Sequence, residues 1–219
     1  LVSYHEHNER ERTADLVERM RAGSVVALVS DAGMPLVSDP GFLLVRGCVA
    51  AGLAVEVLPG PSSVLAALVA SGLPSARWRF VGFAPRKQGE LLELVQSSET
   101  VVAFESPARL GRTLATIAEA DPQRATAVCR ELTKVHEEVV RGTAAELAER
   151  YGQQAPRGEV VLVLGPSREG PGRSEQAVAA LRRLVESGAR PRSAARVVAE
   201  LTGEPVNGLY RALTEEPPE

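Results

Sequence analysis

Apolar and polar residues follow one another along the chain in blocks that predict strands and helices in alternation. Leu110, Leu114 and Ile117 recur at helical spacing, as do other apolar residues between the strand-like runs. The runs of strand length are Val25–Ser30, Leu53–Leu58, Trp78–Phe83, Thr100–Phe104, Ala125–Arg130 and Glu159–Leu164. Strands that alternate with helices over short connections favour an α/β fold. We expect two such lobes, residues 1–74 and 75–165.

Helix ends carry residues that are typical of them. Asp39 and Pro40 stand before Phe42–Ala51, as an N-cap and a first helical residue would. Thr143 and Glu146 have the spacing of a capping box, in which each side chain bonds the other residue's backbone N–H. Both patterns predict where a helix begins.

The end of the chain differs in composition from the rest. The stretch 166–174 is rich in glycine, proline and charge, which is typical of a linker. Residues 175–219 predict a small helical module, with helices at Glu175–Glu186, Ala194–Leu201 and Gly208–Leu213. The last two helices suggest a helix-turn-helix pair, or they serve only as a packing cap.

Composition is that of an ordinary soluble globular protein. Of the 219 residues, 44% are apolar and 24% are charged, and the net charge is −3. Aromatic residues make up only 4%, so surfaces that stack single-stranded nucleic acid are few. The longest apolar runs stop well short of the ~20 residues that cross a membrane, and no charged-then-apolar leader is seen. We therefore expect a cytoplasmic protein without a membrane span.

Cysteine and histidine are placed in a way that argues against a metal site. Cys48 and Cys129 lie in apolar surroundings without C-x-x-C spacing, so we expect both to be buried small hydrophobic residues. His5, His7 and His136 are too dispersed for a histidine-rich site.

Basic residues gather in two places. One group is Arg77, Arg79, Arg86 and Lys87, and the other is Arg182, Arg183, Arg190, Arg192 and Arg196. Because the net charge is mildly acidic, contact with nucleic acid has to come from such local groups. A solvated face of any protein also contains such groups, so both interpretations stand.

Three loops contain more glycine, proline, serine and acid than a turn requires. They are DAGMP (Asp31–Pro35), PGPSS (Pro59–Ser63) and ESPAR (Glu105–Arg109), and each follows an apolar run. Open α/β sheets bind ligands outside the carboxyl ends of their strands, and glycine lets a ligand reach the backbone. The phosphate loop G-x-x-x-x-G-K-[ST] and the dinucleotide pattern G-x-G-x-x-G are both absent from the sequence. A neutral or cationic ligand fits these loops better than a triphosphate; each loop alone is equally well a structural turn.

Six motifs occur in a fixed order: DAGMP-LVSDPG, LPGPSS, FVGFAPRK, FESPARL, RELTK and GEVVLVLG. Together they resemble the tetrapyrrole-methylase-like superfamily of S-adenosylmethionine (SAM) methyltransferases. Within it, they are most similar to the branch that methylates the ribose 2′-OH of a cytidine in 16S rRNA. The resemblance extends from Tyr4–Glu9 (YHEHNE) to the helical tail. Such proteins usually open with a strand and the loop PTPIGNL, which residues 1–74 do not contain, and often have Thr where Met34 stands.

The resemblance implies that SAM lies folded in a cleft between the two lobes. The residues that fall on the cofactor loops are Asp31, Ala32, Gly33, Pro35, Pro61, Ser62 and Ser63. The sulfonium is a cation that carbonyl and carboxylate oxygens favour, and a helix that begins near Ser62 offers free N–H groups to the methionine carboxylate.

The resemblance also implies in-line methyl transfer to a ribose hydroxyl on the small ribosomal subunit, by a homodimer that needs no metal. A base or acceptor has to take the hydroxyl proton. Glu105 and Glu131 are the candidates, with Lys134 as an electrostatic alternative. Arg86 and Lys87 become candidate phosphate contacts, as do Arg109 and Arg130. The two acids and the last two arginines are equally well explained as structural ion pairs.

Two other functions stay open. In the first, the chain is a methyltransferase whose acceptor is a tetrapyrrole or another small molecule. In the second, the chain is a non-catalytic adaptor that binds nucleic acid through its last helices. An adaptor binds nucleic acid whether or not SAM is present and transfers no methyl group.

Overall fold

The computed structural model describes residues 1–167 and 171–214. The chain divides into two compact units, Leu1–Pro166 and Ser167–Glu219. The boundary falls at the start of the predicted linker 166–174. The division of the first unit at residue 74 stays a prediction.

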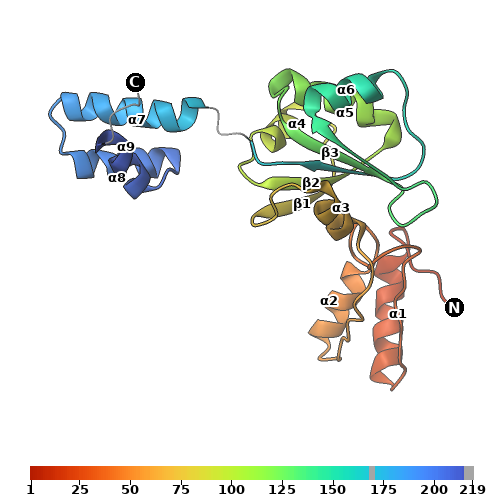
Figure 1. Ribbon diagram of the computed structural model, residues 1–219. Coiled ribbons are helices and arrows are strands. Elements are labelled where there is room, and N and C mark those ends of the chain that lie inside the picture. The colour runs from red at the N-terminus through yellow and green to blue at the C-terminus, as the bar shows by residue number, and fades with distance from the viewer. Residues whose placement is uncertain (168–170, 215–219) are drawn as a thin grey trace. The chain divides into compact units, whose positions relative to one another are not determined.

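In the described part of the first unit, five strands form one sheet (Figure 1). They are β1 Trp78–Phe83, β2 Thr100–Glu105, β3 Ala125–Arg130, β4 Glu138–Thr143 and β5 Val160–Leu164, in the order β1-β2-β5-β3-β4. β1 and β2 are parallel, and β5 is antiparallel to both β2 and β3. The carboxyl ends of β1, β2 and β3 therefore lie at one edge of the sheet. The apolar pattern predicted these strands and β5 to within one residue, but it did not predict β4.

Three helices cover one face of this sheet (Figure 1): α4 Gln88–Val95, α5 Pro107–Ala120 and α6 Ala144–Gly152. The apolar face predicted for α5 is confirmed, because Leu110, Leu114 and Ile117 are fully buried in the core beneath these helices. A Cβ on Gly111 would lie 2.6 Å from the carbonyl oxygen of Tyr151, so α5 and α6 can pack this closely only through glycine.

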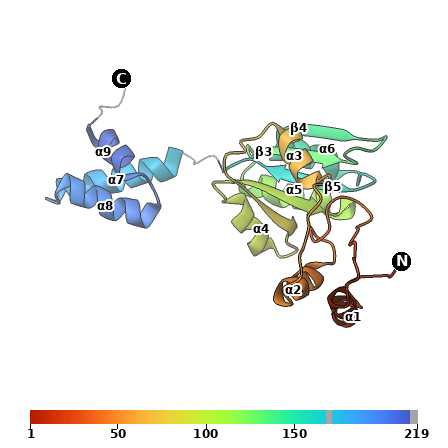
Figure 2. The same cartoon turned by 90° about the horizontal axis from the view of Figure 1, so that it is seen from below.

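Helix α3, Ser63–Ser71, packs on the opposite face of the sheet, toward the viewer in Figure 2. Its buried residues Val64, Ala67 and Leu68 pack on the sheet residues Val102 and Val163. The core that these residues form between α3 and the sheet begins at Val64, next to the loop that leads into α3.

The two strands predicted in the first 74 residues are wrong. Val25–Ser30 and Leu53–Leu58 form no strand, although the fold as a whole is α/β as predicted. A strand forms where a neighbouring strand takes its backbone hydrogen bonds, and no described strand lies beside either segment. The side chain positions reflect this, since Val25 is 99% and Leu58 is 77% exposed.

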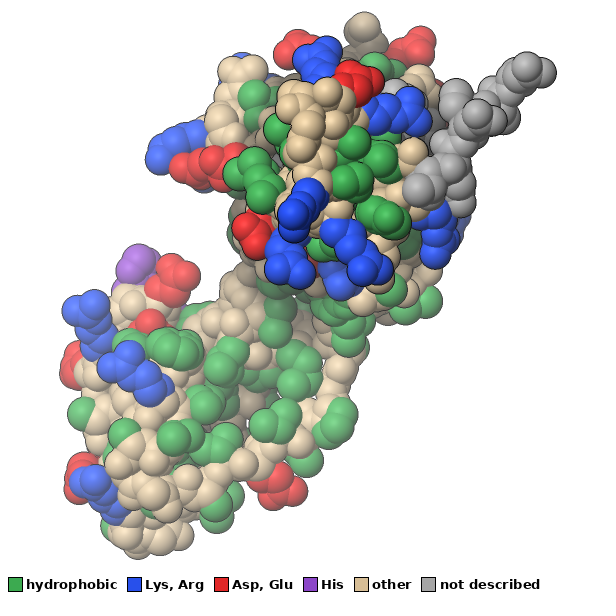
Figure 3. Space-filling model, turned by 90° about the vertical axis from the view of Figure 1, so that its left-hand side faces the viewer, with side chains coloured by type: hydrophobic (Ala, Val, Ile, Leu, Met, Phe, Trp, Pro, Cys, Tyr) green, Lys and Arg blue, Asp and Glu red, His purple; other side chains and the backbone are tan. Residues whose placement is uncertain are grey.

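Helices α1 Glu9–Arg21 and α2 Phe42–Ala50 pack against each other around Leu16, Leu44 and Cys48. Figure 3 shows many hydrophobic side chains on the surface of this lower part of the molecule. The N-cap predicted at Asp39 is wrong: the cap residue is Gly41. The left-handed backbone at Ser38, with a φ of 62°, and at Gly41 delays the start of the helix.

Other local predictions hold. Thr143 and Glu146 form the predicted capping box at the start of α6. Cys48 and Cys129 are buried and free, as expected for small hydrophobic residues. Burial raises the pKa of the Cys129 thiol to about 11, which keeps it protonated near neutral pH.

The second unit consists of α7 Pro171–Glu186, α8 Pro191–Thr202 and α9 Val206–Thr214. The three predicted helices are confirmed with longer bounds, and they have a core of their own around Leu181, Ala195 and Leu209. Because α7 begins at Pro171, the linker prediction is wrong for residues 171–174. Residues 168–170 of that prediction lie outside the described residues.

Candidate functional site

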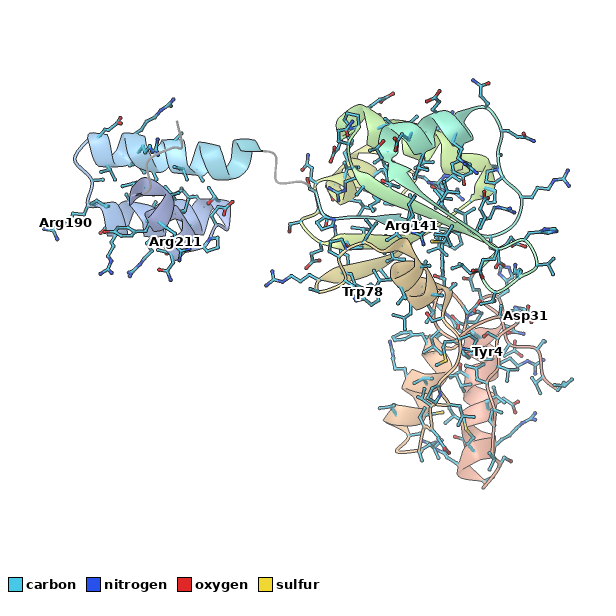
Figure 4. The ribbon with its side chains drawn as sticks, in the orientation of Figure 1. Tyr4, Asp31, Trp78, Arg141, Arg190 and Arg211 are labelled. Atoms are coloured by element: carbon cyan, nitrogen blue, oxygen red, sulfur yellow. The ribbon has the colours of Figure 1, made fainter. Side chains whose placement is uncertain are left out.

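The first predicted cofactor loop has a demanding backbone. Gly33 has a φ of +76°, and Leu36 and Ser38 just beyond it have φ values of 71° and 62°. Non-glycine residues adopt this region at a cost of about 1–3 kcal/mol each. The Ser30 hydroxyl donates to the Gly33 carbonyl at 2.9 Å and supports the turn from inside. Figure 4 shows Asp31 where the α1–α2 part meets the sheet-bearing part.

The two predicted cofactor loops lie against each other. A Cβ on Gly33 would lie 3.4 Å from the carbonyl oxygen of Pro61. A Cβ on Gly60 would lie 2.9 Å from the sulfur of Met34, so Met34 fills the space that a side chain there would take. Loops that are almost thirty residues apart in sequence therefore meet.

Helix α3 points its N-terminus at the carboxyl ends of β2 and β3. At the other end, Pro74 accepts a hydrogen bond from Thr100, the first residue of β2, and Arg141 donates to the Ala70 and Ser71 carbonyls (Figure 4). Halfway along, the Cys129 thiol near the end of β3 lies 3.8 Å from the Ala67 carbonyl oxygen. The PGPSS loop, which leads into α3, therefore lies on the side where β2 and β3 end.

Ser62 begins this helix as predicted. Its hydroxyl accepts a hydrogen bond from the Leu65 N–H at 3.4 Å, which makes it the N-cap. A helix N-terminus leaves backbone N–H groups without intrahelical partners, and they favour an anion such as a carboxylate.

Glu105, at the end of β2, is closed off from solvent. Its side chain is 0% exposed. One carboxylate oxygen accepts from the Ser106 N–H at 2.6 Å, and the other accepts from the Thr113 hydroxyl at 2.5 Å. Arg109 Nη2 lies 3.4 Å from that second oxygen. The carboxylate is thus surrounded by its own protein partners.

Arg109 is also committed within the protein. Its Nη2 donates to the carbonyl oxygens of Ala84 at 3.0 Å and Pro85 at 2.9 Å. Arg86 and Lys87 follow in the same loop and are exposed. Lys87 pairs with Glu90 at 2.9 Å, and this hydrogen bond raises the pKa of the Lys87 ammonium.

The RELTK segment after β3 is more open. Glu131 is 17% and Lys134 is 45% exposed, and their charged atoms lie 2.8 Å apart. Lys134 also pairs with Glu159 at 3.1 Å. The hydrogen bond from Lys134 lowers the pKa of Glu131, and the same bond raises the pKa of Lys134.

This segment also has an unusual backbone. Glu131 has a φ of 50° and Thr133 a φ of 67°, the left-handed region that non-glycine side chains rarely adopt. Glu131 is held there by the residue that precedes β5, since its carboxylate accepts the Glu159 N–H at 2.9 Å. Arg130 is bonded to Glu138 at 3.1 Å and to the Arg157 carbonyl.

A family model described as Tetrapyrrole (Corrin/Porphyrin) Methylases matches residues 2–148. The chain belongs to the tetrapyrrole methylase family. Methyl transfer is therefore its reaction class, and the predicted family, fold class and enzyme class are confirmed.

Named relatives of this tetrapyrrole methylase are similar over most of their length. Ribosomal RNA small subunit methyltransferase I of Micromonospora olivasterospora is 42% identical over 217 residues, which cover 96% of this chain and 69% of that protein. The protein of the same name from Mesorhizobium japonicum is 42% identical over 222 residues, 98% of this chain and 74% of the relative.

Solved structures share the fold. Uroporphyrin-III-C-methyltransferase from Thermus thermophilus has a TM-score of 0.53 at 26% identity, over 72% of this chain and 71% of that one. A Thermus thermophilus uroporphyrin-III C-methyltransferase complexed with S-adenosylhomocysteine has a TM-score of 0.51 at 24% identity, over 74% and 75%.

Within residues 1–167 and 171–214 of the methylase, no three His, Cys, Asp or Glu side chains gather as a metal site requires. No helix there has the length and apolar character to span a bilayer.

The structure brings together more residues than the sequence predicted. Thr113 and Glu159 complete the carboxylate contacts at the ends of β2 and β3, and neither was predicted. The spacing of Arg109 and Thr113, four residues apart in the predicted helix that follows Glu105, is a signal that was available, because such residues share one face of a helix. Glu159 gives no such signal, since it meets Glu131 only through the pairing of β5 with β3.

Proposed function

We propose that this methylase uses SAM to methylate the ribose 2′-OH of a cytidine in 16S rRNA of the small ribosomal subunit. The observation that carries the proposal is 42% identity, over 96% of the chain, to a protein named ribosomal RNA small subunit methyltransferase I. The family gives the reaction class, and the name of the relative gives the RNA.

The cofactor belongs to the two loops that meet at Gly33 and Pro61. Asp31, Ala32, Gly33 and Pro35 from one loop offer backbone oxygens and a carboxylate, which suit the sulfonium cation. From the other loop, Pro61, Ser62 and Ser63 lead into the N-terminus of α3, which suits the methionine carboxylate. A protein of this fold has been solved with S-adenosylhomocysteine, the product that SAM leaves after methyl transfer. Bound SAM supplies the methyl group.

The chemistry is largely positioning. Alignment of nucleophile and methyl group contributes up to ~7–11 kcal/mol in the best intramolecular cases, and the hydroxyl proton has to leave. Among the candidate acceptors, Glu131 and Lys134 are reachable from solvent, whereas Glu105 is 0% exposed. We assign the proton acceptor to Glu131, with the Lys134 ammonium stabilising negative charge on the ribose oxygen.

RNA is held by exposed cations. Arg86 and Lys87 are exposed at the carboxyl end of β1, next to the end of β2 and at the same edge of the sheet as the end of β3. Contacts of this kind position the backbone without reading sequence. Arg109 and Arg130 were predicted to share this role, and their hydrogen bonds to the protein favour a different one.

The protein works as a cytoplasmic homodimer in this proposal. Large apolar side chains lie open on the first unit, among them Val69 at 81%, Val49 at 66% and Leu65 at 52% exposure. Exposed apolar area of this kind is typical of an interface, and Leu65 and Val69 share one face of α3.

The test is to incubate the protein with methyl-labelled SAM and small subunits that lack the modification, and to map the label. We expect one labelled cytidine in 16S rRNA. Label on a tetrapyrrole that is offered in a parallel reaction, with none on the subunits, supports the alternative acceptor, which the fold shared with uroporphyrin-III-C-methyltransferase favours. RNA binding that is indifferent to SAM, with no label transferred, supports an adaptor.

A matched pair of variants tests the cofactor loops. Gly33→Val and Gly23→Val both place a side chain on left-handed backbone, with φ of 76° and 96°. Only Gly33 faces another loop, since nothing lies within 4 Å of a Cβ on Gly23. We expect calorimetry to show loss of SAM binding in Gly33→Val alone; equal affinities in the two variants would place the cofactor elsewhere.

A further inference from the structure

The loop between β1 and α4 is held in place by a network that starts at a buried acid. The Glu105 network consists of Glu105, Ser106, Arg109 and Thr113. Its central carboxylate joins the end of β2 to Thr113, which lies in the second turn of α5. Since Arg109 and Thr113 are one helical turn apart on α5, a single acid fixes both side chains.

Arg109 connects this network to the loop between β1 and α4. One nitrogen, Nη2, donates to two consecutive carbonyls, those of Ala84 and Pro85. The Ala84 N–H already bonds the Phe104 carbonyl at 2.8 Å, and proline has no N–H. Arg109 therefore holds the carbonyl oxygens of the two loop residues just before Arg86.

Arg86 and Lys87 depend on that loop for their direction. Both are exposed, and the Lys87 ammonium donates to Glu90 one turn further on, within the start of α4. Long side chains on a fixed backbone lose less freedom on binding than the same side chains on a moving one. The direction of the Arg86 and Lys87 side chains is thus set by the backbone at Ala84 and Pro85.

Charge argues against a direct role for Arg109 in phosphate binding. Its guanidinium faces a fully buried carboxylate and two carbonyl oxygens, and 28% of the side chain is exposed. Truncating one partner of a buried pair leaves the other uncompensated. Glu105 and Arg109 together add no net charge to the surface that meets RNA.

We propose that Glu105 and Arg109 are positioning residues, which hold the loop Ala84–Lys87 so that Arg86 and Lys87 meet the RNA backbone. Neither touches the reacting atoms. The inference rests on the proposed function for its activity readout, but not for its structural readout.

The experiment compares Arg109→Lys with the control Arg112→Lys, an exposed arginine on the same helix. Lysine keeps the charge but lacks the planar fork that serves several acceptors. We expect Arg109→Lys to raise KM for small subunits about tenfold, the scale of one or two lost phosphate contacts. In Arg109→Lys, kcat at saturating subunits and SAM affinity stay within about twofold of wild type. In Arg112→Lys, KM, kcat and SAM affinity all stay at the wild-type values.

Coupling separates this proposal from its rivals. In a protein that already carries Arg86→Ala and Lys87→Ala, adding Arg109→Lys has little further effect, because the side chains that it positioned are gone. If Arg109 bound phosphate itself, the effects on KM would add, and the proposal fails. A loss of kcat of about a hundredfold or more in Glu105→Gln would make Glu105 the proton acceptor, and the proposal fails then too.

Hydrogen exchange gives a readout that needs no activity. We expect the amides of Arg86 and Lys87 to exchange faster in Arg109→Lys than in wild type or Arg112→Lys. Unchanged exchange overturns the positioning role even if 16S rRNA is the substrate. If wild type methylates no rRNA, the proposed substrate fails, while faster exchange still supports the network.

Discussion

Two acids at the ends of parallel strands, Glu105 on β2 and Glu131 after β3, look alike in the sequence and differ in the structure. Each is followed by a basic residue, Arg109 or Lys134, with which it pairs. The Glu105 side chain is 0% exposed and that of Glu131 is 17% exposed. An acid with a nearby cation is thus an internal support in one case and an accessible charge pair in the other.

The difference comes from the path of the chain beyond each strand. After β2, Pro107 opens a helix of 14 residues, whose inner face delivers Thr113 and Arg109 to the carboxylate. After β3 the chain enters the short connection to β4, where left-handed backbone at Glu131 and Thr133 turns the acid outward. Chain direction after the strand, rather than the motif, decides which acid is available for chemistry.

The largest effect is expected on stability. Glu105→Ala leaves the Thr113 hydroxyl and the Ser106 N–H without their acceptor and removes the carboxylate that faces Arg109, and Thr113 is 3% exposed. Unsatisfied buried groups cost about 1–3 kcal/mol each, so we expect a loss of about 3 kcal/mol in the free energy of unfolding. Urea unfolding measures it. Glu131→Ala is the control with a clearly smaller loss, and equal losses would erase the distinction between the two acids.

Turnover should respond in the opposite order. Glu131→Gln keeps an oxygen to accept the Glu159 N–H but cannot take a proton. We expect kcat to fall about a hundredfold, the lower end of what general-base catalysis contributes, with SAM affinity unchanged. Single-turnover methylation of small subunits checks this, with Glu105→Gln as the comparison. A larger fall in Glu105→Gln would reverse our assignment of the two acids.

A glycine beside Glu131 offers a finer test. Gly158 has a φ of +91°, and a Cβ there would overlap the Glu131 carboxyl group. Alanine on such backbone costs about 1 kcal/mol or more, and it displaces the acid from its place. We expect Gly158→Ala to lose about that much stability and to lower kcat about tenfold. Gly152→Ala, with nothing within 4 Å, is the control for both measurements.

The sequence predicted those features that depend on neighbours along the chain. The β2 and β3 strands, the start of a helix near Ser62 and the Thr143 capping box were predicted, and they are confirmed. The strands at Val25–Ser30 and Leu53–Leu58 failed because strand formation depends on a partner that a local pattern does not contain.

The two acids show the same limit within the site. Their positions after β2 and β3 were visible in the sequence, and so was their nearness to basic residues. Their exposure was not, because Thr113 and Glu159 reach them through helix packing and through the pairing of β5 with β3. Burial depends on tertiary packing, and it is burial that distinguishes the role of Glu105 from that of Glu131.

The smallest effect concerns pH. The hydrogen bond from Lys134 lowers the pKa of Glu131, so this acid contributes stability above its unfolded pKa and loses it as pH falls through the folded value. Bonds to Glu131 and Glu159 raise the pKa of Lys134, so its contribution is full below its unfolded pKa and is lost as pH rises through the folded one.

The melting temperature of wild type should therefore exceed that of Lys134→Met by a small, constant amount at pH values between the pKa of Glu131 and that of Lys134. The difference should shrink at more acid and at more alkaline pH. Added salt should shrink it as well, because the pair is partly exposed. In Lys134→Met, carbon-detected NMR should show the pKa of Glu131 moving up toward its ordinary value, while Arg112→Met leaves it in place. A Glu131 pKa that does not move would mean that the Glu159 N–H, not Lys134, sets the pKa of Glu131. Glu131 would then depend on contacts within the protein, as Glu105 does.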